Sequence, residues 1–213
     1  QSDATGFVAW GEHLAWDLIE DRITLGSERN GKFVVSDIHE YYGPWIHWKT
    51  TCEVAPEQAR RFAAGLWEHQ IADHETCEFS LHARYSKHAP AKGYEFLRQV
   101  GFYLDTWASV WAATGDDRLL KPIQQFLKAL RKWQNPETGL MPFEGRSPDV
   151  AFILHNLSFA VDGWEASTKL PEGLAGEFQA LIQTVDDAVL KLEYDLAADG
   201  QGFPKIADTR TGE

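Results

Sequence analysis

A turn followed by an aromatic residue recurs three times along this 213-residue chain, and the repeat constrains the fold more than any other feature. The turns read DHETCEF, NPETGLMPF and ADGQGFP, and they end near Phe79, Phe143 and Phe203, about 60 residues apart. Between them, apolar residues recur at spacings of three and four, which is typical of amphipathic helices. The repeat therefore predicts an all-α fold of antiparallel helical hairpins.

The hydrophobic spacing locates the individual helices. We expect a leading helix over residues 7–18, a second that begins near Pro56, and others over about 94–113, 119–133, 150–166 and 174–196. A tight turn is expected at Thr114 to Asp116, where Gly115 can adopt the left-handed conformation and Asp116 can cap the next helix. The helix over 150–166 is apolar on nearly all sides, so burial inside the fold is predicted for it. A short strand is expected at Lys32 to Val35.

Charge and composition exclude several classes of partner. The net charge of −12 argues against nucleic acid and anionic membranes, which both require basic surface. No apolar run is long enough to span a bilayer. The chain begins at Gln1, as a matured or trimmed product would, which indicates a secreted or periplasmic protein. Cys52 and Cys77 could form one disulfide bridge or none.

Two short motifs complete a resemblance to a known family. TGDDRLL at 114–120 and ETGLMPF at 137–143, together with the hairpin period, resemble the (α/α)-toroid or six-hairpin carbohydrate-active enzymes, which include glycosidases and several polysaccharide lyase families. The resemblance implies a ring of hairpins, with a saccharide-binding cleft at the end where the loops enter the inner helices. Residues 1–213 would form a single toroid domain that is incomplete, with about three hairpins plus a leading helix.

Size is where the chain departs from that family. A closed ring of six such hairpins needs roughly 360 residues, because repeat units add almost linearly. We therefore expect the domain to be part of a larger ring, completed by a second chain or by self-association. A small open helical solenoid that is sufficient in itself is the alternative.

The loop around residues 82–98 is the first candidate site. The stretch from Leu66 to Tyr103 holds four of the eight histidines, and positive charge gathers from residue 84 to residue 98 within an otherwise acidic protein. A lyase must neutralise a uronate carboxylate, remove the neighbouring proton and protonate the leaving oxygen. We assign the proton transfers to His82 and Tyr85, and substrate binding to Arg84, His88 and Arg98.

A second candidate loop runs from Ser36 to Trp48. It concentrates histidine, glutamate, tyrosine and tryptophan around a Gly-Pro turn that would display them. His39 and Glu40 are assigned as further catalytic residues. The remaining assignments are to substrate binding, and they are Trp45, Trp48, Glu12, Trp16 and His155.

Other chemistries stay open at this point. No motif requires a cofactor, and no structural zinc pattern occurs, but a divalent metal held by His39, Glu40 and His82 is an alternative. A glycoside hydrolase would instead need two carboxylates about 5 to 9.5 Å apart. A non-catalytic helical repeat that binds sugar or protein is the third reading. We favour an enzyme that cleaves glycosidic bonds in an acidic, uronate-containing saccharide. The hydrolase candidates are Glu12, Asp17, Glu40, Glu144, Asp149 and Asp162.

Overall fold

The structure is a computed structural model. It describes the chain over residues 48–80, 97–142, 148–192 and 206–212, apart from a few side chains within these ranges, and it also gives the backbone of short strands at 8–10, 14–17, 22–25, 27–29, 32–34 and 93–94.

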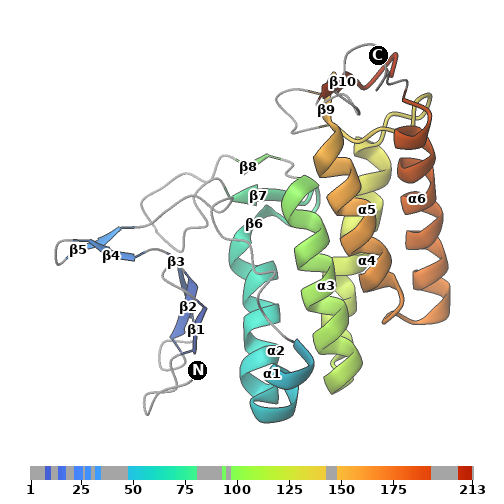
Figure 1. Ribbon diagram of the computed structural model, residues 1–213. Coiled ribbons are helices and arrows are strands. Elements are labelled where there is room, and N and C mark those ends of the chain that lie inside the picture. Colours follow the sequence, from blue (N-terminus) through green and yellow to red (C-terminus); the bar gives the residue numbers. More distant parts are fainter. Residues whose placement is uncertain are drawn as a thin grey trace, which may run out of the picture.

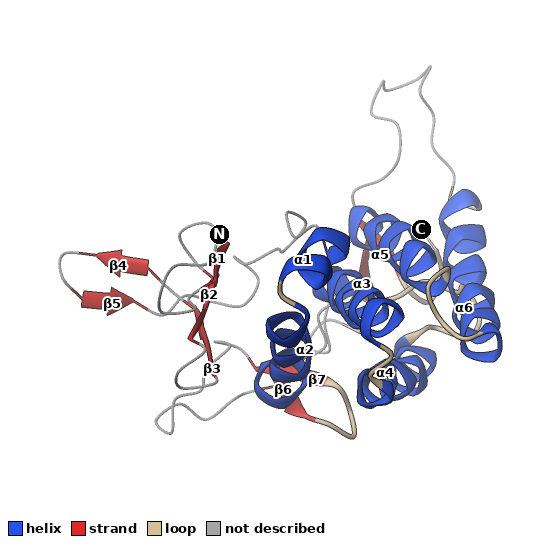
Figure 2. Ribbon diagram, turned by 90° about the horizontal axis from the view of Figure 1, so that it is seen from below, coloured by secondary structure: helices blue, strands red, loops and turns tan. Residues whose placement is uncertain are grey.

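Six α-helices form the body of the described structure, and all but the first correspond to helices that the sequence predicted. Their order follows the hairpin pattern, and α3 and α5 pack side by side. Seen along the helices, α1, α3 and α5 lie in one layer and α2, α4 and α6 in another (Figure 2). The helices span Trp48–Val54 (α1), Pro56–Gly65 (α2), Leu97–Thr114 (α3), Leu120–Trp133 (α4), Ile153–Ser167 (α5) and Glu172–Leu190 (α6).

Short antiparallel strands gather at one end of the helices (Figure 1). There α2 continues into a π-helical turn, η2 (Leu66–Gln70), and three strands follow it: β6 (Ile71–Asp73), β7 (Glu78–Ser80) and β8 (Gly93–Tyr94). At the same end, β9 (Val150–Phe152) leads into α5 and pairs with β10 (Ile206–Asp208). These strand pairings lie where the chain enters α3 and α5, at one end of the bundle.

The expected leading helix over residues 7–18 is wrong. The chain there forms β1 (Val8–Trp10) and β2 (Leu14–Asp17), which pair with each other and with β3 (Arg22–Leu25). Gly11 interrupts this segment, and valine and tryptophan favour strands, so apolar spacing alone misled the assignment. The strand expected at 32–35 is confirmed as β5 (Lys32–Val34), paired with β4 (Ser27–Arg29).

Aromatic side chains hold the two layers together. Trp107 of α3 is fully buried and packs near Trp67, Tyr103 and Phe126, with ring centroids 5.5 to 6.1 Å apart. Its indole N–H donates a 2.8 Å hydrogen bond to the backbone carbonyl of Ala63 in α2. This one side chain therefore joins α2, α3 and α4.

The tight turn after α3 is confirmed. Gly115 has a φ of +67°, the left-handed conformation that ends many helices. The carboxylate of Asp116 then accepts a hydrogen bond from the backbone N–H of Arg118, and so caps the short 3-10 helix η3 (Asp117–Leu119) that leads into α4.

The position of α5 matches the sequence only in part. It lies in one layer with α3, but it exposes an apolar stripe of Leu154, Val161 and Trp164, which are 70%, 66% and 47% exposed. The helix is buried where it packs against α3 and α6, as predicted, and this stripe stays exposed because no described helix packs over it. The second chain or self-association inferred from the sequence stays a prediction.

The contact between α3 and α5 gives a paired prediction about glycine. A Cβ at Gly101 of α3 would lie 2.6 Å from the Cβ of Asp162, whereas a Cβ at Gly176 of α6 would meet nothing within 4 Å. Gly101→Ala should therefore destabilise the fold by about 1–3 kcal/mol through overpacking. Gly176→Ala should stabilise it by roughly 0.5–1 kcal/mol, because alanine favours the helix. Chemical denaturation of both variants measures this, and equal effects would contradict the close α3–α5 contact.

Both cysteines are buried and free, so no bridge joins Cys52 and Cys77. Burial raises the pKa of both thiols, that of Cys77 to about 12. Within the described residues, no helix has the length and apolar character needed to cross a bilayer.

Candidate functional site

The first candidate loop joins two paired strands. His82, Arg84, Tyr85 and His88 lie outside the described residues, but the ends of their segment are held together where Ser80 of β7 pairs with Gly93 of β8. Arg98 lies in the first turn of α3, and its side chain is also outside the described set. The strand that follows this loop, β8, precedes α3 in the chain, and the roles of the loop's side chains stay predictions.

The second candidate loop is only partly described. His39, Glu40, Trp45 and Glu12 lie outside the described residues. Trp16 belongs to strand β2 and not to the leading helix that was expected there.

Two other predicted site residues have described side chains. His155, at the start of α5, is half-buried and stacks on Phe152 with ring centroids 5.3 Å apart. Trp48 begins α1 and is only 4% exposed. These two residues belong to different helices, Trp48 to α1 and His155 to α5.

Several candidate carboxylates for hydrolysis can be located. Asp149 is exposed at the loop end, 3.6 Å from Arg210, while Asp162 is half-buried within α5. The helix from residue 153 to 162 rises about 14 Å, so these two carboxylates are too far apart to act as a glycosidase pair. Asp17 lies on β2, and Glu144 lies outside the described residues.

A groove of about 450 Å³ opens on the α1–α3–α5 layer. Four residues of α3 form its floor because they recur on one face of the helix at spacings of three and four. Trp48 and Lys49 of α1 stand on one side, and the C-terminal end of α5 stands on the other. The lining comprises Trp48, Lys49, Asp105, Ser109, Ala112, Ala113, Glu165 and Lys169.

A charge network crosses this groove from α3 to α5. The ammonium of Lys169 lies 2.5 Å from Asp105 and 3.4 Å from Glu165, and the hydroxyl of Ser109 donates to Asp105 at 3.2 Å. Asp105 and Lys169 are each about one quarter exposed, so water screens their attraction only in part. The groove therefore offers fixed hydrogen-bonding groups beside an apolar floor.

Asp162 adjoins this network and gives a prediction about pH. Burial, with the negative charges of Asp105 and Glu165, raises the pKa of its carboxyl group above the ordinary value. The folded protein therefore binds this proton more tightly than the unfolded chain, so the stabilising contribution is present at low pH and is lost as pH rises through the raised pKa. Asp162→Asn should raise the melting temperature at pH 7, and its advantage should shrink below the ordinary pKa of aspartate.

Thermal unfolding of this variant between pH 3 and pH 8 tests the linkage. Asp186→Asn on α6 is the matched control, and its effect should be smaller at neutral pH. A lower melting temperature for Asp162→Asn at pH 7 would show that the ionised carboxylate is needed for stability.

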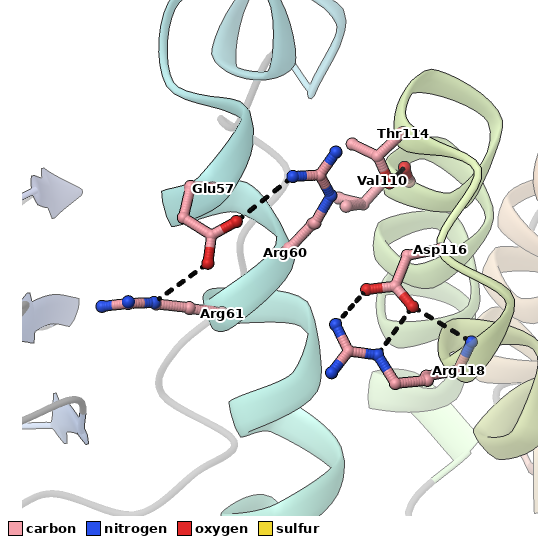
Figure 3. Close-up of polar contacts among 7 residues, drawn as sticks. All are labelled: Glu57, Arg60, Arg61, Val110, Thr114, Asp116 and Arg118. Atoms are coloured by element: carbon pink, nitrogen blue, oxygen red, sulfur yellow. Dashed lines mark hydrogen bonds and ion pairs between the residues drawn. The ribbon is translucent and has the colours of Figure 1, made fainter.

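A second hollow, of about 240 Å³, is lined by the three arginines Arg60, Arg61 and Arg118. Figure 3 shows that Glu57 lies between Arg60 and Arg61 and accepts a hydrogen bond from each. The carboxylate of Asp116 accepts two parallel hydrogen bonds from the guanidinium of Arg118. The Arg118 guanidinium lowers the pKa of Asp116. Because each arginine already pairs with a carboxylate of its own segment, we interpret this cluster as local ion pairs within α2 and within the turn after α3.

Sequence reasoning missed most residues of the larger groove. Among the residues that line the groove, only Trp48 was predicted from the sequence to bind substrate. Lys49, Asp105, Ser109 and Lys169 were not considered. Glu165 and Lys169 stand four residues apart, a signal for a helical ion pair but not for a site. Among the described residues, no three metal-ligating side chains gather closely enough to hold a metal ion.

Comparison with known proteins gives one match. A family model described as periplasmic pectate lyase matches residues 1–115, more than half of the chain. No curated protein and no solved structure is significantly similar to the chain.

Proposed function

This chain belongs to the periplasmic pectate lyase family, and from that premise we propose that it cleaves a uronate polysaccharide by β-elimination at the loop between β7 and β8. The family is one of polysaccharide lyases, so the chain is an enzyme of this class, and the family name agrees with the secreted or periplasmic location expected from the sequence. The family match is the observation that carries the proposal, because it spans every predicted site residue except His155.

β-Elimination requires a base, an acid and a group that neutralises the uronate carboxylate, all close to the bond that breaks. A base removes the proton from the carbon beside the uronate carboxylate, the bond from the next carbon to the glycosidic oxygen breaks, and a double bond forms between the two carbons. The departing oxygen then takes a proton from an acid. His82 and Tyr85 supply base and acid, since both can hold or release a proton in the required range. Arg98 and Arg84 bind the carboxylate and stabilise the charge that develops on it.

His39 and Glu40 are proposed as the second half of the site, with Trp45, Trp16 and Glu12 as neighbouring saccharide contacts. A divalent cation held by His39, Glu40 and His82 would perform the same neutralisation of the carboxylate as the arginines. Activity measured after treatment with a chelator, and again after divalent cations are restored, separates these two ways of stabilising the charge.

The two-layer arrangement of the helices supports the proposal that this site belongs to an (α/α) toroid. We propose that α3 and α5, which share one layer, are inner helices of an (α/α) ring and that α2, α4 and α6 are its outer helices. Residues 1–213 would then form a single domain within a larger ring. Strands β7 and β8, which bound the candidate loop, lie at the end of the helices that also carries β9 and β10 (Figure 1).

A product assay tests the function directly. Incubation with polygalacturonate should produce ultraviolet absorbance at the unsaturated-uronate band without added reagents, because elimination leaves a double bond conjugated to the carboxylate. A glycoside hydrolase would release reducing ends with no such absorbance, and a binding module would do neither. The appearance of reducing ends alone would overturn the proposal.

A further inference from the structure

The groove on the α1–α3–α5 layer has the composition of a saccharide-binding surface. Ala112 and Ala113 are exposed on its floor, and the buried indole of Trp48 closes one side. Small apolar side chains suit the apolar face of a pyranose ring, and the polar groups at the margin can fix its orientation.

The polar margin fits the hydroxyl groups of a sugar. Asp105 and Glu165 present carboxylate oxygens that accept hydrogen bonds, and their ion pairs with Lys169 hold them in place across the groove. The lysine has three N–H donors, and two are directed at these carboxylates. From Asp105 to Ala113 the floor extends about 12 Å along α3, long enough for more than one sugar ring.

Lys49 supplies the group that a uronate needs. It is exposed at the mouth of the groove and, within the described part of the chain, forms no salt bridge. An ammonium in this position can pair with a carboxylate on the sugar, and it does so in a protein whose net charge is −12, where non-specific attraction of polyanions is weak.

We propose that this groove is a binding subsite for an oligouronate chain, with Lys49 pairing with a sugar carboxylate while Asp105, Ser109 and Glu165 bind hydroxyls over the alanine floor. The inference rests on the proposed function, which supplies the class of saccharide. The groove lies along α3 toward its C-terminal end, whereas β8, the strand that follows the proposed catalytic loop, precedes the N-terminal end of the same helix. A polymer held in the groove is thereby retained on the enzyme after cleavage at the loop.

The test compares three single variants of the full chain. Lys49→Gln removes the proposed carboxylate partner, Ala112→Trp fills the groove from an exposed helical position, and Lys121→Gln is the control on α4, where the lysine is also exposed. Steady-state kinetics on polygalacturonate should show KM raised roughly three- to tenfold for the first two variants, with kcat within twofold of the parent, because a charge-assisted contact remote from the reaction is lost.

A binding measurement supplies the second readout. Calorimetric titration with trigalacturonate, in a background carrying His82→Ala, should give the same three- to tenfold weakening for Lys49→Gln and a larger loss for Ala112→Trp. Titration with a neutral galactose trimer should respond to Ala112→Trp and not to Lys49→Gln. Circular dichroism confirms that each variant is folded.

The failure of this inference differs from the failure of the proposed function. If the parent cleaves polygalacturonate but both groove variants keep its KM and its affinity for trigalacturonate, the subsite is refuted and the lyase assignment stands. If the parent yields no unsaturated product, the lyase assignment fails, and unchanged trigalacturonate binding in Lys49→Gln would then refute the subsite as well.

Discussion

Replacing His82 by alanine is expected to lower kcat on polygalacturonate by about 10²- to 10⁴-fold, and Tyr85→Phe should have an effect of the same order. Both groups would act only as protons move in the transition state, so the affinity for substrate should change little. Rates are followed through the ultraviolet absorbance of the unsaturated product, and affinity is followed by calorimetry. Arg98→Ala should differ by weakening binding and turnover together, since it holds the carboxylate in both states.

His74 provides the matched control for this series. It is exposed in the turn between β6 and β7, where its ring stacks on Trp67 and bonds the carbonyl of the same residue at 2.8 Å. His74→Gln lies on the same segment as His82 but should keep near-normal turnover. If folded variants at His82, Tyr85, Arg98 and His39 all remain active, the catalytic residues lie elsewhere, and Glu12 and Glu40 become the next to be replaced.

The largest effect on stability is expected from Trp107→Ala. The side chain is fully buried among aromatic rings and bonds Ala63 of the neighbouring helix. Its removal leaves a large cavity at the junction of α2, α3 and α4 and should lower the free energy of unfolding by about 3–5 kcal/mol. For a chain of this size the melting temperature should fall by roughly 10 °C. Denaturant titration and calorimetry measure the two quantities.

A second tryptophan makes this prediction specific. Trp164 on α5 is 47% exposed, so Trp164→Ala removes a similar number of atoms without opening a closed cavity. Its cost should stay below about 1 kcal/mol, as for most surface substitutions. Comparable losses from the two variants would mean that the face of α5 carrying Trp164 is covered in solution, as the predicted second chain or self-association would require.

Local sequence signals determined much of the helical framework. Pro56 starts α2, Gly115 ends α3 with a positive φ, and the apolar spacing from Leu119 to Trp133 places α4. Each of these features depends on residues that are neighbours in the chain, so it can be inferred before any tertiary contact is known. The same local reasoning failed over residues 7–18, where the spacing fits a helix but the chain pairs as strands, because strand pairing depends on partners farther along the sequence.

Only the tertiary structure decided which side chains share a site. The groove combines Lys49 of α1, Asp105 of α3 and Lys169 of the turn after α5, and no spacing in the sequence links them. Their proximity follows from the close packing of α5 on α3 at Gly101, which depends on the register of two helices separated by α4 and a loop. The periodicity of a sequence shows which face of a helix is apolar, but helix packing decides which neighbouring element covers that face. The exposed apolar stripe on α5 could therefore not be inferred from the composition of the helix.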